Sequence, residues 1–275
     1  MKPTSSMVRT FEGRTVVLTG AASGIGRALA NALSRCGATV HALDINADGL
    51  ADLARESAGP GVIHCGTVDV RDIASYTLAV TEVMRISKSI DYLFNNAGVT
   101  LLGEAQNLSF DRWKWLLDIN LMGVIYGTHL IYPIMIAQGS GHIINTASIA
   151  GATGYATAAA YTTSKAAILE FSRSLRSEAK AYGVKVSVAC PGYVDSGIFI
   201  QERIVGADRE AMIRDLPVKM MSPDEAAMGF LTGVVRGEKT MVFPLSAKLL
   251  WYLSRWAPSM TDRFHKRFLR VFQQE

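Results

Sequence analysis

Short apolar runs alternate with longer amphipathic stretches along most of the chain. The runs are rich in β-branched residues and carry little charge, which is the pattern of strands buried on both faces. No repeat, low-complexity tract or linker interrupts the alternation. This order predicts an α/β fold with one doubly wound parallel sheet and helices on both of its faces. The expected strands are 14–19, 38–43, 61–68, 90–94, 141–146, 184–189 and 240–243.

The chain has 275 residues, 49% of them apolar, which suits one large core and is too short for two full domains. We expect residues 1–247 to form this domain, with an irregular loop at about 191–221, and residues 248–275 to form a helical extension.

A glycine-rich turn follows the first expected strand directly. Gly20, Gly24 and Gly26 lie where a helical pattern begins, and Gly37 ends that helix as a left-handed cap would. A second strand follows and is closed by Asp44. Strand, glycine turn, helix, strand and acid within about 30 residues indicate a dinucleotide site of Rossmann type.

The same residues favour NAD as the cofactor. Glycines let the backbone approach a pyrophosphate, and the helix N-terminus supplies free N–H groups. Asp44 is placed to accept hydrogen bonds from a ribose and would repel a 2′-phosphate. Neither Ser23 nor Ile45 offers a compensating cation. The pattern therefore predicts NAD in preference to NADP.

Tyr161 and Lys165 lie four residues apart, and Ser148 lies thirteen residues before Tyr161. If the stretch 155–182 is helical, the lysine shares a face with the phenol, and its charge favours the phenolate. Such an arrangement suits general acid–base chemistry on an alcohol or carbonyl. A Tyr–Lys pair alone is ordinary on a surface helix, so its weight comes from the nucleotide motif before it.

Together these motifs resemble those of the short-chain dehydrogenase/reductase family. Residues 19–26 resemble its TGxxxGxG loop, residues 95–98 its NNAG turn, and Tyr161 with Lys165 its YxxxK pair. The resemblance extends from about residue 12 to residue 244. It implies a catalytic set of Asn120, Ser148, Tyr161 and Lys165.

In that set, the resemblance gives Ser148 the task of orienting the substrate oxygen and Tyr161 that of exchanging the proton. Lys165 would hold the nicotinamide ribose and lower the pKa of the tyrosine. Asn120 would anchor a water that links Lys165 to solvent; without the resemblance, a polar residue that caps or kinks its helix is the simpler interpretation.

The resemblance also implies a set of cofactor contacts. The family usually has threonine where this chain has Ser196, and the hydroxyl is kept. The expected cofactor-binding residues are Gly20, Ser23, Gly24, Ile25, Gly26, Asp44, Asp69, Val70, Asn96, Ala97, Gly98, Tyr161, Lys165, Pro191, Gly192, Val194 and Ser196.

The expected substrate region is apolar, both in the loop at 191–221 and at Val99, Leu101 and Ala150. Such a lining favours a lipophilic alcohol or ketone, of steroid, retinoid or long-chain type, and offers no partner for a carboxylate or phosphate. Packing of the loop onto the core is the alternative. The expected substrate-binding residues are Ser148, Ile149, Tyr155, Tyr161, Tyr193 and Phe199.

These observations predict an NAD-dependent alcohol dehydrogenase or ketoreductase. A nucleotide-binding sensor or scaffold without turnover is the second hypothesis. The three cysteines show no metal-ligand spacing, so we expect no metal site, and we expect buried, reduced thiols in a cytoplasmic protein. The N-terminal stretch lacks the apolar core of a signal peptide.

The last 28 residues hold six basic and two acidic residues, which is the whole net charge of +4. Pro258 is expected to divide them into two helices, the second with an apolar stripe of Met260, Phe264, Phe268 and Phe272. We favour packing of this tail on its own protein or within a homodimer or homotetramer. Peripheral membrane contact is the alternative, and closure of the substrate pocket by residues 249–256 is another. Nucleic-acid binding is not expected, because the basic residues are interleaved with apolar ones.

Overall fold

The computed structural model describes residues 2–214, 216, 218–257, 269 and 272. At its centre is a seven-stranded sheet in the order β3-β2-β1-β4-β5-β6-β7, in which every neighbouring pair is parallel. The predicted fold class is confirmed, and all seven expected strands are present. The strands are β1 (Thr15–Thr19), β2 (Thr39–Asp44), β3 (Ile63–Thr67), β4 (Tyr92–Asn95), β5 (Gly141–Thr146), β6 (Val184–Pro191) and β7 (Thr240–Phe243).

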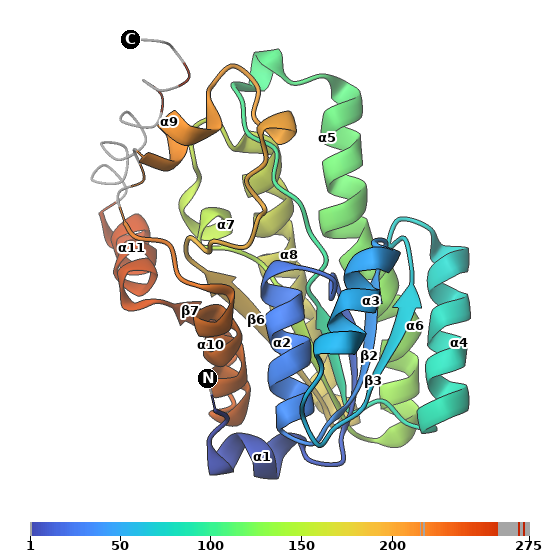
Figure 1. Ribbon diagram of the computed structural model, residues 1–275. Coiled ribbons are helices and arrows are strands. Elements are labelled where there is room, and N and C mark those ends of the chain that lie inside the picture. Colours follow the sequence, from blue (N-terminus) through green and yellow to red (C-terminus); the bar gives the residue numbers. More distant parts are fainter. Residues whose placement is uncertain (1, 215, 217, 258–268, 270–271, 273–275) are drawn as a thin grey trace.

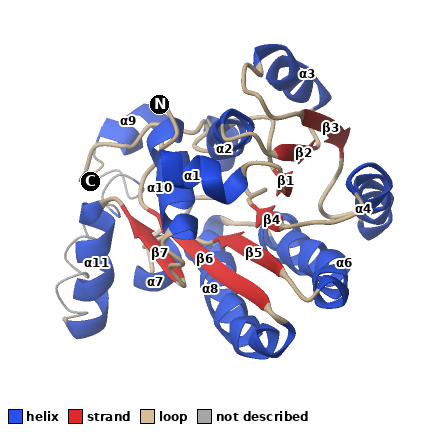
Figure 2. Cartoon of the chain, turned by 90° about the horizontal axis from the view of Figure 1, so that it is seen from below, coloured by secondary structure: helices blue, strands red, loops and turns tan. Residues whose placement is uncertain are grey.

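Helices cover both faces of the sheet (Figures 1 and 2). On one face lie α2 and α10, with the N-terminal α1 packed on α10; on the other lie α4, α6 and α8. The helices are α1 (Ser5–Phe11), α2 (Gly24–Arg35), α3 (Ala47–Glu56), α4 (Ile73–Ser87), α5 (Phe110–Leu117), α6 (Gly123–Gln138), α7 (Ala150–Thr153), α8 (Ala159–Ala179), α9 (Arg209–Arg214), α10 (Pro223–Val235) and α11 (Leu245–Trp256). Short helical turns are η1 (Ala105–Asn107), η2 (Asp118–Met122), η3 (Lys180–Tyr182) and η4 (Gln201–Arg203).

Two apolar cores sandwich the sheet. Every residue of β1 is buried, and its side chains alternate between the two cores, with Val16 in one and Val17 in the other. Because strands at the centre of a doubly wound sheet are covered on both faces, their sequences read as continuous apolar runs. The N-terminal helix adds Met7 and Phe11 to the core under α2 and α10.

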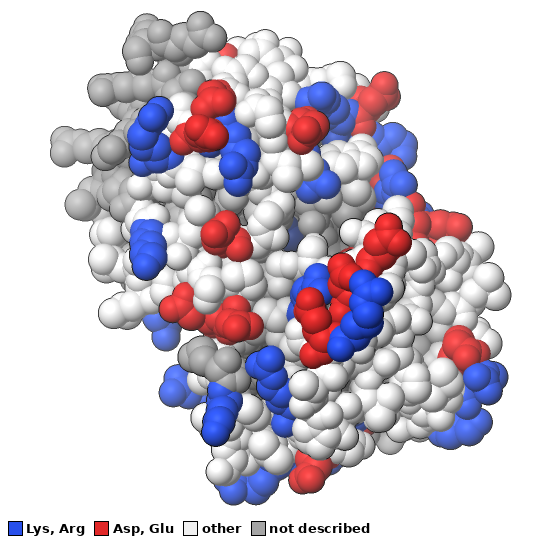
Figure 3. All heavy atoms as spheres, in the orientation of Figure 1, with Lys and Arg blue, Asp and Glu red and all other residues white. Residues whose placement is uncertain are grey.

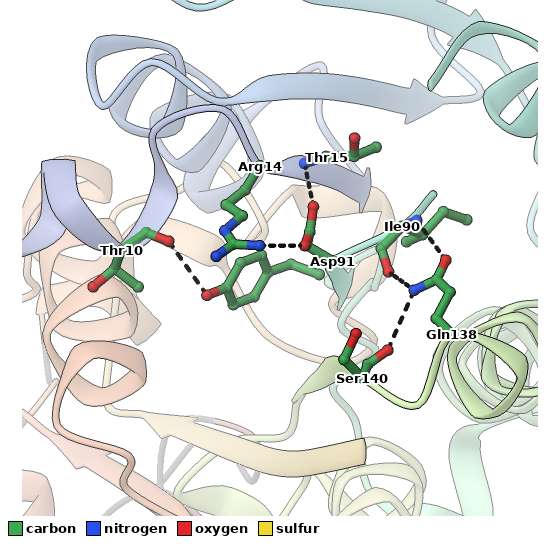
Figure 4. A network of polar contacts seen from close by, with 8 residues as sticks. Thr10, Arg14, Thr15, Ile90, Asp91, Gln138 and Ser140 are labelled. Carbon is green, nitrogen blue, oxygen red and sulfur yellow. Dashed lines mark hydrogen bonds and ion pairs between the residues drawn. The ribbon is translucent and has the colours of Figure 1, made fainter. Parts of the chain in front are cut away.

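Polar contacts fix the amino ends of the central strands (Figure 4). Asp91, before β4, accepts hydrogen bonds from the Arg14 guanidinium and from the backbone N–H of Thr15, both at 2.9 Å. Gln138, at the end of α6, accepts a hydrogen bond from the Ile90 N–H and donates one to the Ile90 carbonyl, each at 2.9 Å. These bonds set the stagger of β1, β4 and α6 and leave the opposite, carboxyl edge of the sheet for a binding site.

The helix expected at 155–182 is shorter than predicted. It begins at Ala159, because Thr157 takes a left-handed conformation with φ of 64° that α-helix cannot accommodate. Its last turn, η3, is a tighter 3₁₀ turn that ends at Gly183. Tyr161 and Lys165 both remain within α8, so their shared helical face is confirmed.

Beyond β7, α11 runs from Leu245 to Trp256 and covers most of the segment in which the first helix of the tail is expected. Trp251 and Ala247 are buried against the core, whereas Leu249 and Trp256 are exposed. In the second expected helix, Met260, Phe264 and Phe268 lie outside the described residues. Phe272 is buried, in a cluster that contains Leu102, Ala158, Ile204 and Met212.

The expectation of buried thiols holds for two of the three cysteines. Cys36 and Cys190 are buried thiols, but Cys65 is exposed, because β3 is an edge strand with one side open to solvent. Within the described part of the chain, one helical stretch, Phe110–Gln138, is long and apolar enough to span a membrane by composition, with 39% of its most apolar window buried. It comprises α5, η2 and α6 and packs on β4 and β5, so it is explained as a core helix of this fold.

Candidate active site

A cleft of about 490 Å³ runs along the carboxyl edge of the sheet. It spans the point between β1 and β4 where the strand order reverses, which is where ligands bind in open α/β sheets. All the residues expected to contact the cofactor line this cleft, and so do all six expected substrate residues. Asn120 is the one candidate site residue that does not line the described part of the cleft.

The glycine turn leaves no room for side chains. Gly20 has φ of 69°, and a Cβ there would lie 2.7 Å from Cα of Ala97. A Cβ on Gly26 would lie 1.8 Å from the carbonyl oxygen of Gly20. Ser23 precedes α2 without a capping side-chain bond, and the first turn of α2 has no acidic residue. The backbone N–H groups of the first turn of α2 are therefore open to an anion in the cleft, as binding of a pyrophosphate requires.

Thr19 joins this turn to the NNAG turn after β4. Its Oγ1 accepts hydrogen bonds from the backbone N–H groups of Asn96 and Ala97, at 3.0 and 3.1 Å. The side-chain amide of Asn96 donates in return to the Thr19 carbonyl at 3.1 Å. The two turns thus form one rigid floor. Thr19 is not among the expected site residues. Its position at the end of β1, next to the glycine turn, could have indicated a role in the site.

Asp44 lies at the ribose end of the cleft. Its two carboxylate oxygens accept hydrogen bonds from the backbone N–H groups of Ala22 and Asn46, each at 2.9 Å, which hold it beside the glycine turn. Further along, the Arg71 guanidinium hydrogen-bonds to Asp69 and lowers the pKa of that carboxyl. A fixed carboxylate, a glycine turn without room for side chains and an uncapped helix end together fit a nicotinamide dinucleotide.

Ser148, Tyr161 and Lys165 come together on the opposite wall. Ser148 follows β5 and forms a hydrogen bond with the Tyr161 hydroxyl. Lys165 is only 3% exposed, and its Nζ donates to the Thr146 carbonyl at 2.9 Å. The same Nζ lies 5.7 Å from the centre of the Tyr161 ring. The three residues grouped from the sequence therefore lie together, Ser148 just after β5 and the other two on α8.

The electrostatics of this wall are dominated by burial. Burial raises the pKa of Tyr161 to about 12, against the hydrogen bond from Ser148, which lowers it. Burial also lowers the pKa of Lys165 to about 8. The expected lowering of the Tyr161 pKa by Lys165 is not found in this structure, because desolvation of the phenolate dominates and the hydrogen bond from Ser148 is the contact that lowers the pKa. Tyr161 holds its proton across the neutral range.

Asn120 lies directly behind the cleft wall, in the π-helical turn η2. Its amide donates to the Val99 carbonyl at 2.9 Å and to Ser164 Oγ at 3.1 Å, and its oxygen accepts from the Val99 N–H at 2.8 Å. A Cβ on Gly98 would lie 3.3 Å from both the Asn120 oxygen and Lys165 Nζ. Asn120 thus joins the NNAG turn to α8, and π-turns of this kind are frequent at functional sites.

The other half of the cleft is mainly apolar. Tyr155 and Tyr193 meet edge to face with ring centres 6.1 Å apart. Leu101 and Ile204, expected at the surface of the pocket, are buried behind it. Several residues that line the cleft are not among those expected from the sequence, namely Leu102, Trp115, Arg203 and Leu216. Arg203 corrects the expectation that this region offers no partner for an anion.

Comparison with known proteins settles the family. The family model described as short chain dehydrogenase matches residues 14–204. The chain belongs to the short-chain dehydrogenase/reductase family. It is 33% identical to the ketoacyl reductase HetN of a Nostoc species, over 94% of this chain and 90% of that protein. It is 31% identical to the 3-oxoacyl-acyl-carrier-protein reductase FabG of Thermotoga maritima, over 80% and 90%.

The fold of this short-chain dehydrogenase/reductase also matches solved structures. A short-chain dehydrogenase/reductase from Burkholderia phymatum in complex with NAD superposes with a TM-score of 0.81. It is 24% identical, and the match covers 91% of this chain and 96% of that one. The family is one of oxidoreductases, so the cleft described above is the candidate site for a nicotinamide cofactor and a small substrate.

Proposed function

We propose that this short-chain dehydrogenase/reductase interconverts an alcohol and its carbonyl compound by hydride transfer with NAD(H), on a substrate with a lipophilic body. The observation that carries the proposal is that one cleft holds both the glycine turn and the Ser148, Tyr161 and Lys165 wall. Two relatives, HetN and FabG, are named as reductases of oxoacyl compounds, which supports a carbonyl substrate.

In the proposed reaction, the bound nicotinamide would supply or accept the hydride. Ser148 holds the substrate oxygen, and the Tyr161 hydroxyl, kept protonated by burial, donates its proton to that oxygen during carbonyl reduction. The Lys165 ammonium is fixed by Thr146 beside the tyrosine ring, at the floor where a nicotinamide ribose would lie. Asn120 holds the NNAG turn against α8.

A nucleotide-binding sensor without turnover is the competing proposal. Members of a fold can keep nucleotide binding while losing a catalytic group. Here Ser148, Tyr161 and Lys165 are all retained and share one wall, which favours turnover.

The test is reduction of a panel of lipophilic ketones and aldehydes, with NADH and NADPH in parallel. We expect oxidation of NADH by at least one compound, and slower oxidation of NADPH, because Asp44 repels a 2′-phosphate. Asp44→Ala combined with Ile45→Arg is expected to shift the preference toward NADPH. A wild-type preference for NADPH would contradict the cofactor proposal, and binding of NADH without turnover of any compound would favour the sensor.

We further propose a cytoplasmic homodimer or homotetramer whose tail contacts protein rather than membrane. The burial of Trp251 and Phe272 within the chain supports packing of the tail on protein. Sedimentation is expected to give the mass of a dimer or tetramer, and flotation with anionic liposomes to leave the protein in the dense fraction. Recovery of the protein with the floating liposomes would favour membrane contact through the exposed face of α11, which includes Leu249 and Trp256.

A further inference from the structure

Arg203 is a cation in the otherwise apolar substrate half of the cleft. It ends the 3₁₀ turn η4 and lines the cleft together with Leu102 and Trp115. Its guanidinium carbon lies 5.6 Å from the centre of the Trp115 ring. The other charged side chains on the described cleft wall are Lys165, beside the tyrosine, and the three on the nucleotide side, Asp44, Asp69 and Arg71.

The Arg203 guanidinium has an aromatic neighbour, and the exposed Glu202 beside it in the chain is a carboxylate that acts on it without forming an ion pair within the described residues. Among the described residues, no acidic side chain forms an ion pair with it, whereas Arg71 pairs with Asp69 at 2.6 Å. Arg203 is half-buried, and burial lowers the pKa of its side chain, though arginine remains charged in proteins. A partly desolvated cation without a directly hydrogen-bonded anion is costly unless a ligand supplies one.

The backbone around Arg203 is anchored. The Leu102 N–H donates to the Arg203 carbonyl at 2.9 Å, and the Val205 N–H donates to the Leu102 carbonyl at 2.8 Å. These bonds form a parallel bridge between Leu102 and the buried Ile204. An arginine held over an indole face keeps its N–H edge free to donate, and that edge matches a planar carboxylate with two parallel hydrogen bonds.

We propose that Arg203 binds a carboxylate of the substrate, so that the enzyme acts on oxo or hydroxy carboxylic acids with an apolar body. This inference rests on the proposed function and adds the substrate class to it. Apolar side chains that line the same cleft, such as Leu102, Met212 and Phe199, would contact the body of such an acid. A single guanidinium in an apolar setting balances one negative charge, whereas a phosphate ester would bring nearly two.

The test compares oxo acids with their methyl esters, using ketones placed at several distances from the carboxyl group. With NADH as reductant, the wild type is expected to prefer an acid over its ester by about 10- to 100-fold in kcat/KM, the range for a charge-assisted bidentate bond. Arg203→Gln should bring that ratio close to one, and Arg203→Lys should keep part of it. Melting temperature and NADH affinity should not change in either variant.

Arg112→Gln is the matched control, since Arg112 is an exposed cation on α5 outside the cleft. It should keep the wild-type ratio. Equal use of acid and ester by the wild type, or an unchanged ratio in Arg203→Gln, would overturn the proposal. If no compound is reduced, the proposed function fails, and calorimetric titration of the acids into the NADH-bound protein decides on Arg203 separately. Binding that weakens at least tenfold in Arg203→Gln supports the carboxylate site, and absent or unchanged binding refutes it.

Discussion

Replacing Tyr161 with phenylalanine is expected to lower kcat by about 10²- to 10⁴-fold, the usual contribution of a positioned acid–base group. The Tyr161 ring packs against two apolar clusters, one containing Leu101 and the other Leu102. Phenylalanine keeps that packing. Only the hydroxyl is lost, together with its bond to Ser148. Turnover should therefore fall while NADH affinity, measured by fluorescence titration, stays within a few-fold of the wild type.

Tyr182→Phe is the control for this substitution. Tyr182 lies in η3, half-exposed and away from the cleft, so the same loss of a hydroxyl should leave kcat unchanged. A Tyr161→Phe protein that turned over at the wild-type rate would show that the phenol does not carry the proton.

Lys165→Met is expected to abolish turnover and yet to stabilise the cofactor-free protein. Burial lowers the pKa of Lys165 from 10.5 to about 8, a penalty on the charged form of about 3 kcal/mol at neutral pH. Methionine has a similar length and no charge. The Thr146 carbonyl loses its donor, which offsets about 1–2 kcal/mol of the gain. The net result is a melting temperature higher by a few degrees at pH 7.

The pH dependence of this stabilisation gives a sharper readout. Between pH about 8 and 10.5, Lys165 has lost its proton in the folded state but keeps it in the unfolded state. Because the unfolded state then binds more protons, raising the pH stabilises the wild type relative to Lys165→Met. The advantage of the variant should therefore shrink across that window in denaturant titrations.

An exposed lysine offers the comparison. Lys180→Met, in η3, removes a solvated charge and should give no stabilisation at any pH. A constant difference in unfolding free energy between wild type and Lys165→Met from pH 7 to pH 10 would mean that the Lys165 charge is not desolvated.

The strands were predictable because a parallel sheet covered on both faces demands continuous apolar runs. Their observed limits differ from the expected ones by two residues or fewer, as for 61–68, which became Ile63–Thr67. The order of the glycine turn, NNAG turn and Tyr–Lys pair in the sequence predicted which residues meet in the cleft. All of these residues occupy strand ends or adjoining helices, where the topology alone brings them together.

What escaped prediction depends on contacts between distant segments. The role of Thr19 arises from its hydroxyl meeting Asn96 and Ala97, far along the chain. Arg203 lies in an irregular loop, and only the fold sets it over Trp115. The raised pKa of Tyr161 reflects desolvation, which four-residue spacing on a helix does not reveal. The late start of α8, after Thr157, likewise depends on the left-handed backbone angle of that residue.

The central claim is that a bound nicotinamide gives a hydride to a carbonyl carbon, and that Tyr161, beside Lys165, gives its proton to the carbonyl oxygen. The most direct measurement is the transfer of deuterium from NADH labelled at the reactive carbon, followed by mass spectrometry of the products from the ketone and oxo-acid panel. The wild type is expected to yield an alcohol with one deuterium on the carbinol carbon, and Tyr161→Phe, saturated with the same NADH, to yield little. Absence of labelled alcohol from the NADH-bound wild type, or equal label from the Tyr161→Phe protein, would contradict the account.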